Sequence, residues 1–288
     1  MTIDTKTPTL GSVIDVLESL YDPAWARDWD RVGLVCGDPS LPVRRILLAV
    51  DPVAAVVNEA LEWHADLLLT HHPLLLRPVH SVAATTAKGQ LVHRLVRAGC
   101  ALYTAHTNAD VAAPGVSDAL ARVLGLTDLR PLVADADGGG ARGVGRIGRL
   151  TAPTTLREFA MLVAEALPAS AQGVRVAGEP GGIVQTVAVC GGSGDDLVGA
   201  AREAGVDAFV TADLRHHPAS ELREEVGEGT PYLIDVSHWS SEWPWLAGVA
   251  NRLEGVLEAA GTPVEVQVSA RCSDPWLFRV PSPGGIVR

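Results

Sequence analysis

Lysine is scarce in this chain, which contains it only as Lys6 and Lys88 and takes nearly all its positive charge from arginine. Acidic residues outnumber basic ones, so the formal charge is -11 and the isoelectric point is about 5.2. Such a charge opposes non-specific attraction to nucleic acid and to anionic lipid. A phosphate-bearing ligand would have to be bound by arginines such as Arg31, Arg77 or Arg215, whose planar guanidinium groups suit phosphate. We therefore expect a small-molecule substrate, and neither a nucleic acid nor a membrane as partner.

Long apolar runs and paired cysteines are also missing. No uninterrupted apolar stretch approaches the roughly 20 residues that a membrane-spanning helix needs. The first residues lack the cationic start and apolar core of a secretory signal. The four cysteines are far apart and form no C-x-x-C pair, which is typical of a reducing compartment. Because 47% of the residues are hydrophobic, the chain can bury a substantial core, and we expect a globular, cytoplasmic protein.

The first part of the chain alternates between strand and helix patterns. Apolar strands are expected at residues 45–50, 65–71 and 101–105, and amphipathic helices at 52–63 and 87–98 lie between them. A strand, helix, strand, helix, strand order is typical of a largely parallel sheet with crossover helices. The sequence therefore predicts an α/β fold.

The same order recurs after the middle of the chain. Residues 132–145 are rich in aspartate, alanine and glycine, a composition typical of a linker or an exposed loop. Beyond this segment come a strand at 184–189, a glycine-rich turn, a helix and a strand at 208–211. We therefore predict two related α/β halves, residues 1–132 and 143–288, which together form one unit.

Two short motifs occur in both halves in the same order. Each motif follows an expected strand, so the repeated pattern includes the side chains at the strand ends. This recurrence supports a duplication and draws attention to the histidines. The repeated motifs are His71-His72-Pro73 with His216-His217-Pro218, and His106-x-x-x-Asp110 with His238-x-x-x-Glu242.

The histidines at the strand ends are candidate metal ligands. Open α/β sheets place their sites beyond the carboxyl ends of the strands, and neutral imidazole is the commonest transition-metal ligand. Taken singly, His71 and His72 could instead cap a strand, and Glu242 could be an acid that stabilises a helix start. Because histidines and acids recur at comparable strand ends, we favour a metal site. If the segment after His238 is helical, the spacing of four lets Glu242 chelate the same ion or bridge two ions.

The number of candidate ligands favours two ions. Three histidines with two or three acids exceed the three protein ligands of a typical open zinc site. Carboxylates beside imidazoles favour Zn, Mn, Fe, Co or Ni over Mg. Two such ions that share a bridging carboxylate would lower the pKa of bound water and generate hydroxide near neutral pH. The predicted reaction class is hydrolysis.

Five stretches of the sequence carry a resemblance to a known family. They are Trp29-Asp30-Arg31-Val32-Gly33-Leu34, Thr70-His71-His72-Pro73-Leu74, His106-Thr107-Asn108-Ala109-Asp110, Thr211-Ala212-Asp213-Leu214-Arg215-His216-His217, and His238-x-x-x-Glu242. With these stretches in family order over nearly its whole length, the chain resembles the NIF3-like family, also called GTP cyclohydrolase 1 type 2 homologues. Two positions depart from the family pattern, since Arg31 replaces a usual asparagine and Ser237 a frequent glycine.

The resemblance implies a duplicated α/β fold with a dinuclear divalent-metal centre between the halves. It also implies a homohexamer. His106 would lie close to the metals without binding them, or act as a proton shuttle. The metal ligands that the resemblance implies are His71, His72, Asp110, His238 and the bridging Glu242.

The family name implies a specific reaction, the opening of the GTP imidazole ring with loss of formate to give a dihydroneopterin triphosphate. A metal-bound hydroxide would attack C8 of guanine, and Glu242 or His106 would manage the protons. Two alternatives stay open. The protein could be a non-catalytic metal-binding or regulatory hexamer, or a hydrolase of another nucleotide or phosphate compound.

Overall fold

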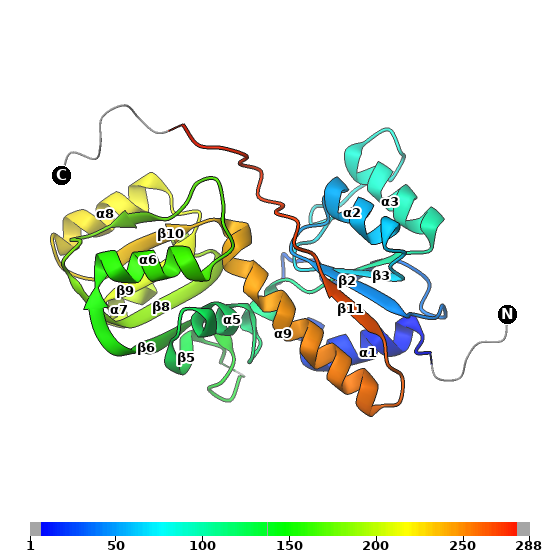
Figure 1. Ribbon diagram of the computed structural model, residues 1–288, viewed down its shortest axis with the longest axis horizontal. Helices are drawn as coiled ribbons and strands as arrows, with labels where there is room; N and C mark the ends of the chain where they lie inside the picture. The colour runs from blue at the N-terminus through cyan, green and yellow to red at the C-terminus, as the bar shows by residue number, and fades with distance from the viewer. Residues whose placement is uncertain (1–6, 137, 281–288) are drawn as a thin grey trace.

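The computed structural model describes residues 7–136 and 138–280, which form two β-sheets with helices on their faces (Figure 1). The strand order is β1-β4-β3-β2-β11 in the first sheet and β5-β6-β8-β9-β10-β7 in the second. The long helix α9 (His238–Ala259) runs diagonally between the sheets in Figure 1. The protein is therefore a mixed α/β protein, as the sequence predicts. No helix in the described ranges combines the length and the apolar character needed to cross a bilayer.

The first sheet is mostly parallel and buried. β2, β3 and β4 run parallel, β11 is parallel to β2, and β1 is antiparallel to β4 at the edge. All four residues of β3 are buried, because a central parallel strand is covered on both faces and reads as a continuous apolar run. The strands are β1 (Gly33–Cys36), β2 (Arg45–Ala49), β3 (Leu67–Thr70), β4 (Ala101–Thr104) and β11 (Glu265–Val268).

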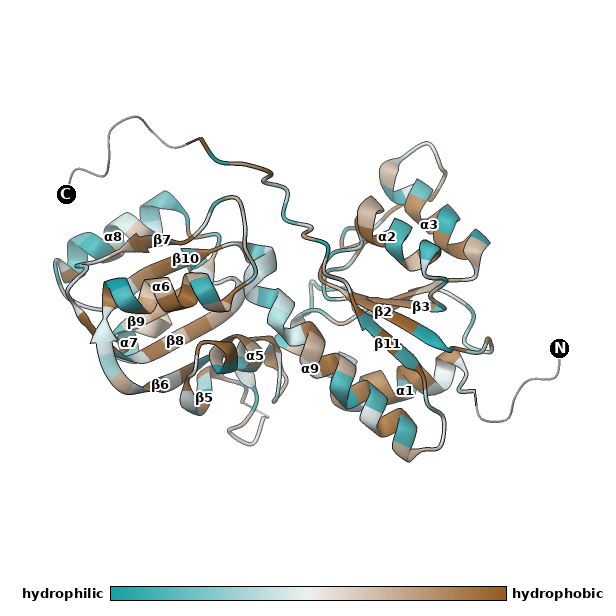
Figure 2. Cartoon of the chain, viewed as in Figure 1, coloured by the Kyte–Doolittle hydropathy of each residue, from teal (hydrophilic) through white to brown (hydrophobic). Residues whose placement is uncertain are grey.

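Two layers of helices cover the first sheet. The helix α1 (Leu10–Leu20) packs with α9 on one face, where Leu10, Val13 and Leu17 form its buried stripe. The helices α2 (Ala54–Glu62) and α3 (Ala87–Ala98) cover the other face. In Figure 2 the apolar colour is concentrated on the strands and on the helix faces that meet them. The expected order of strands and helices over residues 45–105 is therefore confirmed.

The second sheet is parallel at its centre and antiparallel at its edges. β8, β9 and β10 are parallel, whereas β6 is antiparallel to β8 and β7 to β10. Its strands are β5 (Thr127–Ala134), β6 (Gly143–Thr155), β7 (Arg175–Ala177), β8 (Ile183–Ser193), β9 (Ala208–Ala212) and β10 (Tyr232–Val236). The remaining helices are η1 (Pro23–Trp25), α4 (Thr107–Val111), α5 (Val116–Val123), α6 (Leu156–Ala166), η2 (Asp195–Leu197), α7 (Val198–Glu203) and α8 (His216–Val226).

The segment 132–145 is expected to be a linker or an exposed loop, but both of its ends belong to strands. Residues up to Ala134 belong to β5 and those from Gly143 belong to β6, and the two strands pair antiparallel. The segment is therefore a hairpin, whose turn contains the same glycines and aspartates that a linker would contain. Composition alone could not separate these two structures.

The division into halves 1–132 and 143–288 stays a prediction. Strand pairing adds that β5 begins at Thr127, before the expected boundary, and belongs to the second sheet. The chain also returns to the first sheet at its end, because β11 pairs with β2. The helix α9 makes this return possible and contributes buried residues to the core of the first sheet.

Candidate metal centre

A buried carboxylate lies at the centre of a group of histidines. Glu242 is in the second turn of α9, and its side chain is only 3% exposed. Its oxygens lie 3.0 Å from Nε2 of His238, 3.2 Å from Nε2 of His72 and 3.4 Å from Nε2 of His71. The i, i+4 spacing on α9 explains the first contact, as the sequence predicts. The other two contacts come from the end of β3 in the first sheet.

Each histidine of the cluster is oriented by a hydrogen bond to its other ring nitrogen. With Nδ1–H donating to an oxygen acceptor, the Nε2 atom of a neutral ring keeps its lone pair for a metal. Metal-binding histidines are oriented in this way in proteins. The four bonds are His71 Nδ1 to the Ala105 carbonyl (2.9 Å), His72 Nδ1 to Asp51 (2.7 Å), His106 Nδ1 to Asp30 (2.8 Å) and His238 Nδ1 to Asp213 (2.7 Å).

The potential ligand atoms of the cluster lie close together, so a bound cation could replace the protons between them. The Nε2 atoms of His72 and His238 are 3.3 Å apart. Nε2 of His71 and Oε2 of Glu242 are buried and have no hydrogen-bond partner among the described residues. Buried, unpaired polar atoms are costly unless a cation or proton satisfies them. Because nitrogen lone pairs and a carboxylate are the ligands of transition metals, these residues fit a divalent ion.

Two overlapping groups of ligand atoms are close enough to hold a metal ion. The atoms offered by His71, His72 and His106 lie within 4.8 Å of one another, and so do those of His72, His238 and Glu242. His72 belongs to both groups. Because the Nε2 atom of His72 has one lone pair, it can bind an ion of one group or the other.

The acidic groups of the cluster raise the pKa of His71, His72 and His238. Burial lowers the pKa of His72, but the carboxylates of Glu242 and Asp51 outweigh burial and raise it to about 10. Burial is outweighed in the same way at His238, where Glu242 and Asp213 raise the pKa to about 11. Burial also raises the pKa of Glu242, but the surrounding histidines hold it well below its usual value. The cluster therefore attracts positive charge, from protons or from metal ions.

Metal binding should release protons and should weaken as the pH falls. The pKa values of His72 and His238, about 10 and about 11, keep both rings protonated near neutral pH, whereas a metal ligand must be neutral. Zn²⁺ affinity should therefore rise by up to about tenfold per pH unit for each proton released. Calorimetry in two buffers of different ionisation enthalpy would count the protons. An affinity that stays constant between about pH 6 and about pH 8 would contradict this expectation.

His106 and Asp110 lie beside the central carboxylate. The imidazole ring of His106 is 5.2 Å from that of His71, measured between ring centroids. Oδ1 of Asp110 is 3.7 Å from Nε2 of His71, and its side chain is 24% exposed. His106 is thus a member of a ligand group, whereas Asp110 belongs to neither of the two groups found among the described residues. The expected assignment of Asp110 as a ligand and of His106 as a neighbour stays a prediction.

The comparisons with known proteins agree with this architecture. A sequence model of the family described as Duf34/NIF3 (NGG1p interacting factor 3) matches residues 8–275. The chain belongs to the DUF34/NIF3 family. A Streptomyces coelicolor protein named GTP cyclohydrolase 1 type 2 homolog is 52% identical to it over 276 residues, which cover 96% of each chain. A Mycobacterium tuberculosis protein of the same name is 38% identical and covers 93% of this chain and 96% of its own length.

Solved structures of NIF3 relatives share the fold. A Bacillus cereus protein related to NIF3 superposes with a TM-score of 0.86 at 24% identity, covering 96% of this chain and all of that one. A Staphylococcus aureus hypothetical protein superposes with a TM-score of 0.85 at 26% identity, covering 94% of this chain and 100% of that one. The NIF3-like fold that the sequence predicts is therefore confirmed.

The sequence assigns no role to three aspartates of the site in this NIF3 family member, although Asp30 and Asp213 lie in stretches that carry the resemblance. Asp51 follows β2 and Asp213 follows β9. The candidate histidines occupy the equivalent strand-end positions after β3 and β10. A search for acids directly after strands would have found both. Asp30 binds His106 from a loop 76 residues away in the sequence, so no local spacing relates the two.

A C-terminal segment of the NIF3 chain touches both sides of the site. The hydroxyl of Ser273 donates to Asp51, whose other oxygen holds His72. The hydroxyl of Ser237 donates to the buried carboxylate of Asp274, and Ser237 also caps the helix α9 that begins at His238. Residues just after β11 thus hold Asp51, the partner of His72, and Ser237, the cap of the helix that begins with His238.

The second copy of the His-His motif, in the second half of the chain, contributes no histidine to the cluster. His216 and His217 are exposed in the first turn of α8, with their rings 5.2 Å apart, and they belong to neither candidate ligand group. Asp213, which precedes them, is the residue of that stretch that reaches the site. The equivalence of the two motifs in sequence therefore does not extend to the site.

Gly192, at the end of β8, is required for the approach of β8 to the cluster. Its φ angle is +70°, and an added Cβ would lie 2.4 Å from Oε1 of Glu242 and 3.1 Å from Nε2 of His238. We expect Gly192→Ala to weaken metal binding at least tenfold, because the methyl group would displace two candidate ligands. The left-handed backbone would add a stability cost of about 1–2 kcal/mol.

The matched control for this change is Gly199→Ala. Gly199 is exposed in α7, and an added Cβ there meets nothing within 4 Å. Metal titration of both variants, with thermal melting of each, would compare them directly. Equal metal affinities in the two variants would show that Gly192 does not shape the site.

Proposed function

We propose that this protein is a metal-dependent hydrolase that binds two divalent ions at the Glu242 cluster. The observation that carries the proposal is the convergence of oriented Nε2 atoms from His71, His72 and His238 on a buried carboxylate. A structural role alone would not require three imidazole nitrogens from two sheets to face one buried acid. Each Nδ1 bond supports the same assignment, because it leaves Nε2 for a metal.

The proposed ligands combine imidazole nitrogen with carboxylate oxygen. This combination suits Zn, Mn, Fe, Co or Ni better than Mg. When bound, the ions would supply Lewis acidity, which lowers the pKa of water and orients substrate oxygens. The residues that would hold them are His71, His72, Asp110, His238 and Glu242.

His106 is the proposed group for proton transfer. Its Nδ1 is held by Asp30, which leaves its Nε2 to exchange a proton. Burial raises the pKa of Asp30, but hydrogen bonds from His106 and Thr107 outweigh burial and lower it. A permanently ionised Asp30 would stabilise the imidazolium that forms when His106 accepts a proton.

We propose GTP as the first substrate to test, because relatives that are 52% and 38% identical are named GTP cyclohydrolase 1 type 2 homolog. Opening of the imidazole ring consumes two water molecules. Addition of the first at C8 and cleavage of one C8–N bond gives a formamide. Hydrolysis of that formamide by the second water breaks the other C8–N bond and releases formate. In this proposal His106 accepts the proton of the attacking water and returns it to a leaving nitrogen.

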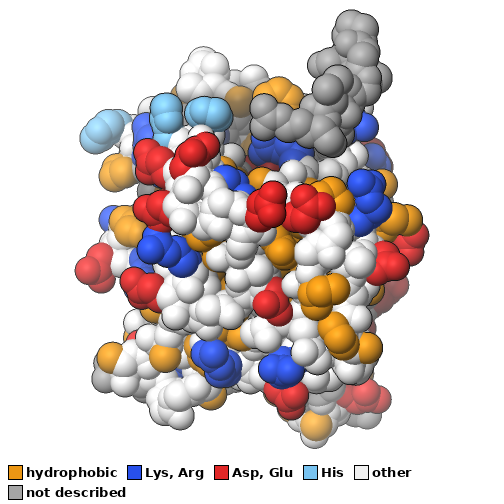
Figure 3. Space-filling model, turned by 90° about the vertical axis from the view of Figure 1, so that its left-hand side faces the viewer, with side chains coloured by type: hydrophobic (Ala, Val, Ile, Leu, Met, Phe, Trp, Pro, Cys, Tyr) orange, Lys and Arg blue, Asp and Glu red, His pale blue; other side chains and the backbone are white. Residues whose placement is uncertain are grey.

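The charge distribution supports a small-molecule substrate. The net charge is -11, and on the face shown in Figure 3 the Lys and Arg side chains lie among Asp and Glu side chains. Nucleic-acid binding needs a concentrated basic surface to displace counterions. On this face the described residues form no such surface.

The proposal is tested by incubating metal-loaded protein with GTP and following formate and the diaminopyrimidine triphosphate by chromatography. We expect turnover that disappears when a chelator strips the metal and returns when the metal is restored. Elemental analysis of the native protein should precede the assay, so that the correct ion is used. Intact GTP after prolonged incubation with fully loaded protein would remove GTP as the substrate.

We also propose that the chain assembles into a homohexamer. The support in the structure is an exposed apolar segment after β11, where Trp276, Leu277, Phe278 and Val280 are 66–87% exposed. Contiguous exposed apolar side chains are typical of association surfaces. Light scattering would measure the mass of the assembly, and a monomer at micromolar concentration would contradict the proposal.

A further inference from the structure

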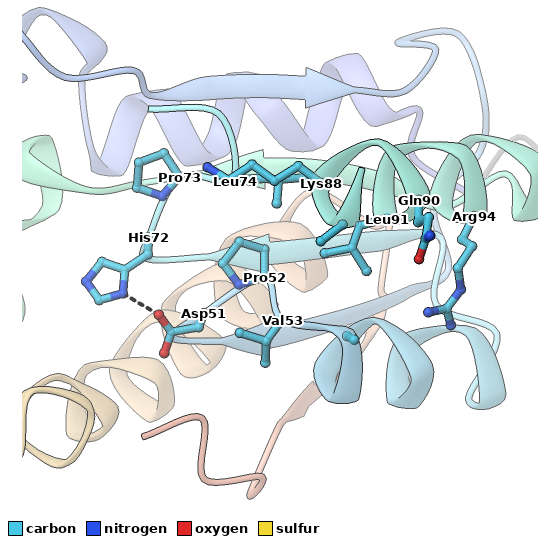
Figure 4. A pocket seen from close by; sticks show the side chains of 12 residues that line it. Asp51, Pro52, Val53, His72, Pro73, Leu74, Lys88, Gln90, Leu91 and Arg94 are labelled. Atoms are coloured by element: carbon cyan, nitrogen blue, oxygen red, sulfur yellow. Dashed lines mark hydrogen bonds and ion pairs between the residues drawn. The ribbon is translucent and has the colours of Figure 1, made fainter. Parts of the chain in front are cut away.

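A cavity of about 420 Å³ opens beside the candidate metal centre, between the start of α2 and the first two turns of α3 (Figure 4). His72 and its partner Asp51 line one end, so the cavity borders the cluster at His72. Its volume falls within the range of small-molecule sites. The cavity belongs to the first sheet, whereas Glu242 and His238 approach from α9.

The cavity contains a cation without an ion-pair partner. Lys88 lines it, is the one lysine in the described part of the chain, and has no carboxylate within ion-pair distance among those residues. In Figure 4 its side chain extends from α3 over Leu74 toward the His72 end. The acid that lines the cavity, Asp51, already accepts hydrogen bonds from His72 and Ser273. Lys88 is therefore free to neutralise a ligand.

The start of α2 adds to the positive potential of the cavity. Pro52, Val53 and Ala54 line the cavity where this helix begins. No side chain caps the helix, and no acid lies in its first turn. The unpaired N–H groups and the helix dipole favour an anion at such an end. Lys88 and the helix start therefore favour the same ligand charge from two sides.

The walls of the cavity are apolar. Leu74 and Leu91 line it together with Val53, and they offer contact to an uncharged ring or sugar. A ligand that fits these features has an anionic group, an apolar or ring-shaped body, and a reactive end at the histidines. We propose that the cavity binds a phosphorylated small-molecule substrate, with Lys88 as the counter-ion of its phosphate.

This inference rests on the proposed function for the reactive end of the substrate, and it adds the place where the phosphate binds and a specificity-determining residue. The sequence expectation that arginines such as Arg31, Arg77 or Arg215 would bind a phosphate is not met at this cavity, which none of them lines. Arg94 does line it, but its guanidinium donates to Asn58. Lys88 is thus the better candidate for the phosphate.

The experiment compares Lys88→Gln with Arg97→Gln in metal-loaded protein. Arg97 is an exposed cation on the same helix outside the cavity, so both variants change the net charge equally. Calorimetry would measure binding of inorganic pyrophosphate, GTP and guanosine, with metal content checked before and after. We expect Lys88→Gln to weaken binding of pyrophosphate and GTP about tenfold and to leave guanosine binding and metal content unchanged. Lys88→Arg should restore binding, and Arg97→Gln should have no effect.

The outcomes separate this inference from the proposed function. If no anion binds, or if Lys88→Gln and Arg97→Gln bind pyrophosphate as the wild type does, the inference is overturned whatever the turnover of GTP. If both variants weaken binding equally, the effect is one of general charge and the inference is also overturned. If anion binding depends on Lys88 but GTP stays intact, the inference stands and the proposed reaction fails.

Discussion

Replacing Glu242 with glutamine should reduce the affinity for divalent metal by about 100-fold or more, since even the outer partners of metal ligands are worth about 10–100-fold. Glu242 is 3% exposed, and its oxygens lie 3.0 to 3.4 Å from three imidazole nitrogens. The amide keeps the shape of the side chain but loses the charge and one acceptor. The NH2 group of the glutamine would also donate a hydrogen bond to Nε2 atoms that must instead bind the metal.

The matched control is Glu258→Gln, which removes an exposed carboxylate from the same helix and changes the net charge equally. Metal content after equilibration with a competing chelator would be measured for both variants by elemental analysis. Circular dichroism would establish that each variant is folded. A folded Glu242→Gln protein with wild-type metal content would show that the cluster is not the metal site.

Replacing Arg146 with methionine should destabilise the fold by about 3–5 kcal/mol, the usual cost of breaking a buried ion pair. Arg146 is 1% exposed in β6 and lies 2.7 Å from the buried carboxylate of Asp118 in α5. Its guanidinium also donates to the carbonyls of Ala112, Gly143 and Gly145. The substitution would leave one buried charge and several acceptors without their donor.

Arg149→Met is the control for this change, because Arg149 is an exposed residue of the same strand. We expect its effect to stay within about 0.5 kcal/mol. Urea unfolding followed by circular dichroism would give both free energies. Adding Asp118→Asn to Arg146→Met should recover part of the loss, because the unpaired charge is then removed. A loss below about 1 kcal/mol for Arg146→Met alone would contradict the assignment.

The strands and helices of the first sheet could be predicted because their patterns are local. The run Leu67–Leu69 is apolar since β3 is covered on both faces, and α1 shows a stripe of Leu10, Val13 and Leu17. Turn composition was less informative. The aspartates and glycines of 132–145 suit a linker and a hairpin turn equally, so the pairing of β5 with β6 was missed.

The candidate ligands could be predicted because they follow strands directly in the sequence. The residues that hold these ligands in place could not be predicted where they lie in a distant loop. His71, His72, His238 and Glu242 stood out by type and spacing, and the structure brings their side chains together. The partner of His106 did not stand out, because Asp30 lies in a distant loop. Gly192 looked like part of an ordinary turn, although its lack of a side chain makes room for Glu242.

The sequence by itself determined the α/β class, the family and the chemical types of the candidate ligands, because periodicity, motif order and residue type are properties of the chain alone. Only the tertiary structure decided which nitrogen of each histidine faces the cluster, that Glu242 is buried at its centre, and that Lys88 lines the neighbouring cavity. These features depend on how two sheets and α9 pack together. Packing brings together residues whose separation in sequence carries no information about their contact.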